Sequence, residues 1–179
     1  IKEVLIILNS NSVIIVVDMQ NDFITGSLGT AEAVKIVPAV EKCLKEAKEQ
    51  GIPLIFTRDT HQSDYLNTSE GKKLPVEHCI EGTDGWEICP ELIPYTKDSI
   101  IINKPTFGSP ALAEAVKNYD NITLLGLCTG ICVLSNAIIL KAFYPEKNIS
   151  VESTLSACVN QETHKTALSA MNLCQINII

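Results

Sequence analysis

The sequence predicts an α/β protein with a three-layer α/β/α sandwich, in which a central, mostly parallel sheet lies between helices. Short apolar runs rich in β-branched residues recur along the chain, and such runs are typical of strands buried on both faces of a parallel sheet. Segments with helical spacing of apolar residues separate most of these runs, as in alternating strand and helix units. The length of 179 residues suits one domain, so we expect residues 1–179 to form a single domain.

The predicted strands coincide with the apolar runs. Residues 13–17 (VIIVV) are the clearest run, because every side chain in it is apolar and β-branched. Four similar runs follow, and a sixth candidate strand lies at the end of the chain: 52–57, 99–102, 122–125, 149–152 and 175–179. Residues 1–12 precede the first run, and we interpret them either as an extra strand or as a loose tail.

The predicted helices occupy the segments 38–50, 110–118, 131–142 and 162–173. The first begins with Pro38, which suits the first turn of a helix, and Gly51 directly after it is a helix stop. Residues 58–97 break the alternation because they hold no convincing strand. Loops of this length are usually functional or disordered. Since this one holds two of the three histidines and Trp86, we expect a functional loop at the active site.

Composition and charge narrow the class of protein. Hydrophobic residues make up 46% and charged residues 20% of the chain, which excludes a disordered or collagen-like chain. The net charge of −7 argues against nucleic acid or an anionic membrane as a partner. The apolar run 4–8 is shorter than the roughly 20 residues of a membrane span, and no signal peptide is expected. The seven cysteines are irregularly spaced, so we expect reduced thiols in a cytoplasmic protein.

Three residues that can perform chemistry follow predicted strands. Asp18 follows the first strand, Lys104 the third, and Cys132 lies shortly after the fourth. Because ligands bind at the carboxyl ends of strands in open α/β sheets, we expect this acid, cation and thiol to meet at one edge. Taken singly, Asp18 would also suit a helix cap, with Asp22 competing for any functional role, and Lys104 would suit a solvated loop.

Cys132 is the sharpest candidate nucleophile. The predicted elements place it in the first turn of the helix 131–142, where backbone N–H groups and the helix dipole lower the pKa of a thiol. The same N–H groups can hold an oxyanion. The alternative is that Cys132 is a small buried apolar residue. Cys128 lies four residues earlier, and this spacing differs from the Cys-x-x-Cys of redox and metal pairs.

Asp59 and His61 form a candidate metal site. Their i, i+2 spacing turns both side chains to the same side of an extended segment. An imidazole beside a carboxylate suits zinc or iron, and His78 in the same loop could complete the site. On its own, Asp-x-His is weak evidence for a metal.

Taken together, these residues resemble a known family. Residues 18–23 (DMQNDF), Lys104 within KPTFGS and Cys132 within TGICV resemble the motifs of the isochorismatase-like cysteine hydrolases, in the same order. The resemblance extends from about residue 13 to residue 179. It implies a catalytic triad of Asp18, Lys104 and Cys132.

Asp59 and His61, and His78-Cys79 followed by residues 82–85 (GTDG), resemble the motifs of the nicotinamidases and pyrazinamidases within that family. The resemblance implies a divalent metal, most simply zinc with manganese or iron as alternatives, bound by Asp59, His61 and His78. Glu70 is the first choice for a further ligand and Asp64 the second. Isochorismatases proper lack this set, so the implied substrate is a small amide, nicotinamide, hydrolysed to nicotinate and ammonia.

The resemblance also implies a cis peptide between Leu127 and Cys128, with the N–H groups of Cys128 and Cys132 forming the oxyanion hole. Two features depart from the family. Gly130 replaces an Asp that is common two positions before the nucleophile, so a side-chain cap is lost. Residues 74–77 (LPVE) replace an aromatic residue common before the metal-binding His78. The remaining candidates for apolar substrate walls are Phe23, Phe107 and Trp86.

Three other functions remain open. The chain could hydrolyse another small amide, or act as a metal-free hydrolase of isochorismate. It could also be a non-catalytic binding or redox-sensing protein on the same fold, in which case Cys132 would react slowly with iodoacetamide. The sequence leaves the oligomeric state open, a homo-oligomer included.

Overall fold

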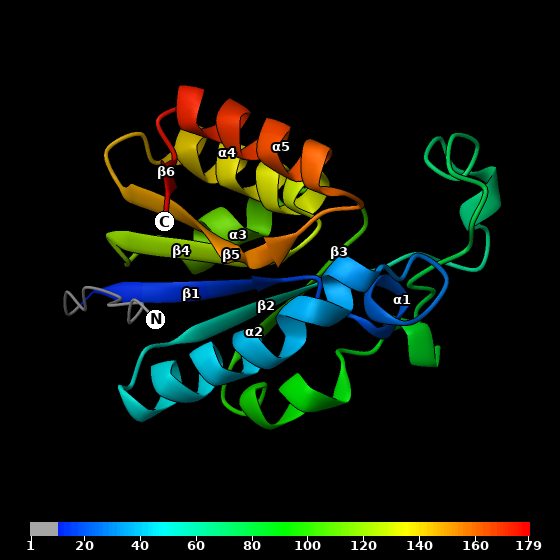
Figure 1. The fold of residues 1–179 in the computed structure, drawn as a ribbon, viewed down its shortest axis with the longest axis horizontal. Coiled ribbons are helices and arrows are strands. Elements are labelled where there is room, and N and C mark those ends of the chain that lie inside the picture. The colour runs from blue at the N-terminus through cyan, green and yellow to red at the C-terminus, as the bar shows by residue number, and fades with distance from the viewer. Residues whose placement is uncertain (1–10) are drawn as a thin grey trace.

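The computed structural model describes residues 11–179, and a six-stranded parallel sheet forms its middle layer (Figure 1). The strands are β1 (Ser12–Val17), β2 (Leu54–Asp59), β3 (Ile100–Lys104), β4 (Asn121–Leu127), β5 (Asn148–Ala157) and β6 (Asn177–Ile178). Their order across the sheet is β3-β2-β1-β4-β5-β6, and every neighbouring pair is parallel. The predicted fold class is confirmed. The extra strand or tail predicted before the first run falls on residues 1–10, outside the described part of the chain, and on residues 11–12 at the start of β1.

Helices cover both faces of the sheet. Figure 1 shows α2 (Ala31–Glu49) on one face, and α3 (Pro110–Ala115), α4 (Leu134–Phe143) and α5 (Gln161–Leu173) on the other. A short helix, α1 (Asn21–Ile24), follows β1 and was not predicted. Within residues 11–179, no helix is both long and apolar enough to cross a membrane.

The central strand β1 is buried on both of its faces, as its unbroken apolar run predicted. Successive side chains of a strand point to opposite faces of the sheet. Accordingly, Ile14 and Val16 pack in the core beneath α2, whereas Val13, Ile15 and Val17 pack in the core beneath α3, α4 and α5. All five side chains are at most 1% exposed.

Helix α2 begins at Ala31 rather than at Pro38, so the predicted start was wrong. Thr30 caps the helix, because its hydroxyl oxygen accepts a hydrogen bond from the N–H of Ala33 at 3.1 Å. Pro38 lies inside the helix on its exposed side. There the carbonyl of Val34, which loses its helical partner to the proline ring, can be hydrated.

The segment between β2 and β3 contributes no strand to the sheet, as predicted. It holds three short 3₁₀ helices, Tyr65–Asn67, Asp84–Trp86 and Pro90–Tyr95. Within this segment, His61 and Ile80 form an isolated β-bridge. A second bridge pairs Ile88 with Gln20, which lies shortly after β1. Figure 1 shows the first part of this segment projecting beyond α1, which follows the carboxyl end of β1. The segment therefore lies beside the strand ends where ligands bind in parallel sheets.

Candidate active site

The carboxyl ends of four neighbouring strands carry the predicted site residues. Lys104 and Asp59 are the last residues of β3 and β2, and Asp18 follows β1 directly. Cys132 lies in the π-helical turn Thr129–Val133 that follows β4. Since these four strands are consecutive across the sheet, their ends form one edge on which the side chains meet.

Asp18, Lys104 and Cys132 form a compact, buried cluster. The Nζ atom of Lys104 lies 2.7 Å from Oδ2 of Asp18 and 3.5 Å from Sγ of Cys132. Asp18 and Lys104 are fully buried, and Cys132 is 4% exposed. A buried acid, cation and thiol in direct contact can activate the thiol as a nucleophile, because the acid can take its proton beside a fixed positive charge.

Asp18 is oriented by its neighbouring strand β2. Its backbone has φ of 48°, a left-handed conformation that Asp tolerates better than most residues. Its N–H donates to the carbonyl of Thr57 at 3.2 Å, and the Thr57 hydroxyl donates to Oδ1 at 2.6 Å. Oδ1 is therefore held by Thr57, which leaves Oδ2 to the ammonium group of Lys104.

Burial and the charge of Lys104 set the protonation of the cluster. Burial lowers the pKa of Lys104, but Asp18, Cys132 and Asp59 outweigh it and raise that pKa, so the lysine stays charged. The pKa of Asp18 is raised, because the effect of burial is larger than the lowering by Lys104. An Asp with a raised pKa binds protons more strongly, which suits a general base.

The pKa of Cys132 is raised, so the expected lowering at a helix N-terminus was wrong. Burial is the main cause, and the neighbouring Asp18 adds to it, whereas Lys104 opposes both. Burial and Asp18 therefore favour the neutral thiol form of Cys132 in this structure.

The turn that carries Cys132 is fixed by backbone and side-chain hydrogen bonds. The Leu127–Cys128 peptide is cis, as the family resemblance implied. The Cys128 carbonyl accepts from the N–H groups of Ile131 and Val133 at 3.0 and 3.1 Å. One helical turn further on, the buried Asn136 side chain donates to the Cys132 carbonyl at 2.8 Å. The turn thus holds the candidate nucleophile in one position.

Asp59, His61, Glu70 and His78 form a second cluster beside the first. Their ligand atoms all lie within 4.8 Å of one another. Nε2 of His61 is 3.2 Å from Oδ2 of Asp59 and 3.8 Å from Oε1 of Glu70. Nε2 of His78 is 3.6 and 3.9 Å from the same two oxygens. Asp64, the second choice for the further ligand, is exposed and lies outside this cluster.

The four side chains fit a divalent metal. A tetrahedral ion with ligands at about 2.0–2.2 Å separates its ligand atoms by roughly 3.3–3.6 Å, close to the spacing described above. Nδ1 of His78 lies 2.8 Å from the Val76 carbonyl. A bond of this kind fixes the imidazole so that Nε2 is the free ligand atom. Burial raises the pKa of Asp59, but His61, His78 and Lys104 outweigh it and lower that pKa, so the carboxylate is ionised.

Asp59 joins the two clusters. Its Oδ2 faces both histidines, while its Oδ1 lies 3.3 Å from Nζ of Lys104. Its backbone is held by Gln20, whose side chain accepts from the Asp59 N–H at 2.7 Å and donates to the Asp59 carbonyl at 2.9 Å. One carboxylate therefore serves a candidate metal site and the candidate catalytic lysine at once.

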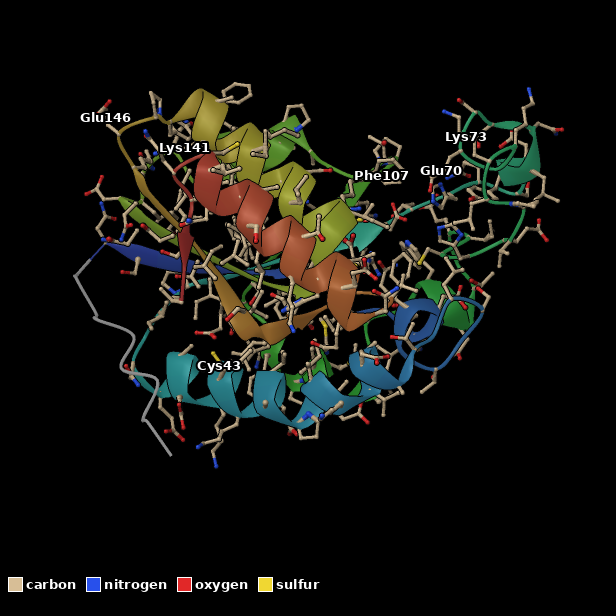
Figure 2. All side chains as sticks on the ribbon, turned by 45° about the horizontal axis from the view of Figure 1, so that its top comes forward. Cys43, Glu70, Lys73, Phe107, Lys141 and Glu146 are labelled. Atoms are coloured by element: carbon tan, nitrogen blue, oxygen red, sulfur yellow. The ribbon has the colours of Figure 1, made fainter. Side chains whose placement is uncertain are left out.

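A pocket of about 480 Å³ opens beside the metal cluster, and Asp18, Lys104 and Cys132 are not among its lining residues. It is lined by His61 and Glu70 of the metal cluster, by Ile131 next to the nucleophile, and by the apolar side chains of Leu74 and Phe107. Figure 2 shows Phe107 on the side of the sheet and helices, with Glu70 and Lys73 on the side of the projecting loop. The pocket therefore lies between the two parts that supply the site.

The three predicted wall residues occupy different places. Phe107 lines the pocket and is 41% exposed. Phe23 is partly buried against the core, with its ring centroid 5.5 Å from that of His78. Trp86 does not line this pocket, because Arg58 covers its ring at 3.6 Å and its Nε1 donates to Thr60 at 2.9 Å.

Sequence reasoning missed three supporting residues: Thr57, Gln20 and Asn136. Each is a fully buried polar side chain that orients a site residue. Thr57 is the polar end of an apolar run, and Gln20 lies inside the first family motif. Asn136 lies four residues after Cys132, where the side chains share a helix face. A polar residue at the end of an apolar strand, inside a family motif or one helical turn from the nucleophile is the signal that could have identified them.

Comparisons with known proteins agree with this fold. Residues 12–179 match the isochorismatase domain. An uncharacterised isochorismatase-family protein of Bacillus subtilis (strain 168) is 28% identical over 170 residues, covering 87% of this chain and 91% of the relative. The zinc complex of Pyrococcus horikoshii pyrazinamidase has 26% identity and a TM-score of 0.82, over 94% of this chain and 98% of that one. The pyrazinamidase/nicotinamidase of Streptococcus mutans UA159 has 25% identity and a TM-score of 0.81, over 94% and 99%.

Proposed function

The chain belongs to the isochorismatase family of hydrolases, and we propose that it is a cysteine-dependent amidase that converts nicotinamide to nicotinate and ammonia. The observation that carries this proposal is the buried contact of Cys132 with Lys104 and of Lys104 with Asp18, beside a four-ligand cluster. The pyrazinamidases and nicotinamidase among the similar structures support an amide as the substrate.

In the first half of the proposed reaction, Asp18 takes the proton of the Cys132 thiol as the sulfur attacks the amide carbonyl. Lys104 stabilises the thiolate, because a nearby cation favours the charged form of an acid. The backbone N–H groups of Cys128 and Cys132 stabilise the oxyanion, where one donor contributes about 3–4 kcal/mol. Asp18 then gives its proton to the leaving ammonia, which leaves a thioester on Cys132.

In the second half, Asp18 takes a proton from a water molecule that attacks the thioester. The same N–H groups hold the second oxyanion, and the C–S bond breaks to release the carboxylic acid. Lys104 remains charged throughout, because its pKa is raised by the surrounding acids. As the C–S bond breaks, Asp18 gives the proton that it took from water to the Cys132 sulfur. The carboxylic acid product then ionises to the carboxylate, and the triad returns to its resting state.

Asp59, His61, Glu70 and His78 would hold the divalent metal, and zinc is the first choice because two imidazoles and two carboxylates suit it. When bound, such an ion supplies a Lewis-acid site for a ring nitrogen, which orients the heterocycle. Orientation of this kind lowers the barrier by fixing the amide carbon close to the nucleophile. The pocket walls Phe107 and Leu74 would then enclose the ring.

The experiment that tests this function measures ammonia release from nicotinamide by the purified protein. The assay is run before and after chelation, and again after zinc, manganese or iron is restored. Benzamide, which lacks the ring nitrogen, is the matched control substrate. We expect metal-dependent release from nicotinamide and much slower release from benzamide.

One observation favours a second substrate class. Leu74 lines the pocket and is 38% exposed, where the family resemblance leads us to expect an aromatic residue nearby. An aliphatic wall suits an amide without an aromatic ring, such as a carbamoyl compound. If folded, metal-loaded protein hydrolyses such an amide but not nicotinamide, the cysteine mechanism stands and the nicotinamidase assignment is wrong.

His61→Ala and His78→Ala should each weaken metal binding by more than about 100-fold. A residue that only hydrogen-bonds to a metal ligand costs at most about 100-fold in metal affinity when it is replaced. Substrate binding should weaken with it, so KM should rise more than kcat falls. Elemental analysis after dialysis measures the first effect, and steady-state kinetics the second. Asp64→Ala is the matched control, because this carboxylate is exposed and outside the cluster. Full metal occupancy in both histidine variants would show that the ligand set is wrong.

A further inference from the structure

Two cysteines outside the proposed triad lie in direct contact. Sγ of Cys128 is 2.8 Å from Sγ of Cys158, although the two residues are 30 positions apart in the sequence. Both are free thiols. Cys128 precedes the turn that carries Cys132, and Cys158 directly follows β5. The mechanism proposed above uses the backbone of Cys128 but neither sulfur atom.

The surroundings of Cys158 favour a thiolate. Sγ of Cys158 accepts a hydrogen bond from the Cys128 thiol, and the Thr163 hydroxyl and the backbone N–H groups of Gly130 and Val159 are its other polar neighbours. Burial raises the pKa of Cys158, but these donors outweigh it and lower that pKa. Burial and the bond to Cys158 raise the pKa of Cys128 to about 12. The first proton that the pair loses therefore comes from Cys158 rather than from Cys128.

Gly130 makes this arrangement possible. A Cβ atom at position 130 would lie 3.3 Å from Sγ of Cys158, closer than ordinary contact. Glycine therefore leaves the room in which the Cys158 sulfur approaches the backbone N–H groups. Glycine at position 130, where the family motif often has Asp, thus matches the position of Cys158 directly after β5.

Cys158 is 6% exposed, and it lies at the wall of a pocket. Cys158, Gly130 and Val159 line a pocket of about 410 Å³ between the turn and α5. Val159 at its rim is 61% exposed. Cys132, in contrast, does not line that pocket, and the pKa of its thiol is raised by burial. Because Cys158 lines this pocket and Cys132 does not, we expect a small oxidant to react at Cys158 before it reacts at Cys132.

We propose that Cys128 and Cys158 form an oxidation site, at which a hydroperoxide converts the two thiols into a disulfide that slows the hydrolase. The Cys158 thiolate attacks one oxygen of hydrogen peroxide, and the O–O bond breaks. Cys158 becomes a sulfenic acid, and the other oxygen is released as hydroxide. Cys128 then attacks the Cys158 sulfur, the S–O bond breaks, and the Cys128 proton leaves with that oxygen as water. One peroxide is reduced and two sulfurs are oxidised by one electron each.

The effect on turnover rests on the function proposed above. Forming the bond draws the Cys128 side chain toward β5, and Cys128 begins the turn that holds the nucleophile and both oxyanion donors. A displacement of about 1 Å in such a turn lowers turnover roughly 100-fold. Reduction of the disulfide returns the turn to its active position, so the loss is reversible.

Mass spectrometry tests the oxidation site. Reduced protein is treated with a few equivalents of hydrogen peroxide, quenched with catalase, unfolded, alkylated and digested. We expect a linked peptide pair containing Cys128 and Cys158, with Cys132 alkylated. Cys128→Ser should stop at a Cys158 sulfenic acid that dimedone traps, and Cys158→Ser should leave Cys128 reduced. Cys174→Ser, which removes an exposed thiol, should still form the disulfide.

Turnover supplies an independent readout. Peroxide should lower the turnover of the wild-type protein by about 10- to 100-fold, and dithiothreitol should restore it. Cys158→Ser should keep its basal turnover and resist peroxide, with Cys158→Ala as the second variant if serine disturbs folding. Oxidation of Cys132 before the pair, or a pair that stays alkylatable, would overturn the site. A disulfide with unchanged turnover would overturn the regulatory effect, while a protein that hydrolyses no amide would refute only the proposed function.

Discussion

Cys132→Ala is expected to lower kcat for amide hydrolysis by at least about 10⁴-fold, because loss of a covalent nucleophile removes the thioester route altogether. The metal cluster should be unaffected, since none of its four ligands is Cys132. Ammonia release under saturating substrate measures the first effect, and elemental analysis of the same sample measures the second. Metal content equal to that of the wild-type protein would show that the loss is chemical.

The matched control is Cys174→Ala, which removes an exposed cysteine far from the proposed chemistry and should leave kcat unchanged. Cys132→Ser separates nucleophile strength from geometry, because its hydroxyl is smaller and less acidic than the thiol. We expect it to fold and bind metal but to turn over close to the alanine variant. Appreciable turnover by Cys132→Ala would refute Cys132 as the nucleophile.

Lys104→Met should cost stability as well as activity. The lysine is fully buried between Asp18 and Asp59, at 2.7 and 3.3 Å from their oxygens. Methionine fills a similar volume but leaves two buried carboxylates without their cation. Breaking a buried ion pair in this way costs about 3–5 kcal/mol of the free energy of unfolding. Urea unfolding monitored by circular dichroism measures that loss.

Two variants control this experiment. Lys42→Met removes a lysine whose side chain is 74% exposed in its pair with Glu46, so the free energy of unfolding should change by less than about 1 kcal/mol. The double variant Lys104→Met/Asp18→Asn removes one uncompensated charge and should regain part of the lost stability, but no turnover. A Lys104→Met protein as stable as the wild type would contradict a charged, buried Lys104.

The fold class could be predicted because the strands carry a strong signal. The run VIIVV leaves β1 no polar face, so the sheet had to be covered on both sides. The starts of helices were harder to predict. Pro38 looked like the first turn of α2, and nothing in its immediate sequence shows that Thr30 caps the helix a full two turns earlier.

The identity of the site residues could be predicted from the sequence, but their pKa shifts could not. Alternating strands and helices predict a parallel sheet, and the carboxyl ends of its strands meet at one edge. The meeting of Asp18, Lys104 and Cys132 at that edge could therefore be predicted. Their catalytic roles remain predictions. The raised pKa of Cys132 could not be foreseen, because complete burial beside Asp18 is a property of packing between β1 and the turn after β4. The contact of Cys128 with Cys158 depends in the same way on where β5 ends.

The order of the strands has a consequence for how this protein comes to be active. Asp18 is held by Thr57 across 39 residues, Asp59 meets Lys104 across 45, and Lys104 meets Cys132 across 28. Contacts remote in sequence form slowly, because a long loop must close before each is made. A nascent chain that stops before β4 contains Asp18, Lys104 and all four residues of the metal cluster, but it lacks Cys132. Turnover therefore requires β1, β2, β3 and β4 to be paired, and we expect it to be lost when these four strands separate rather than when one helix end frays.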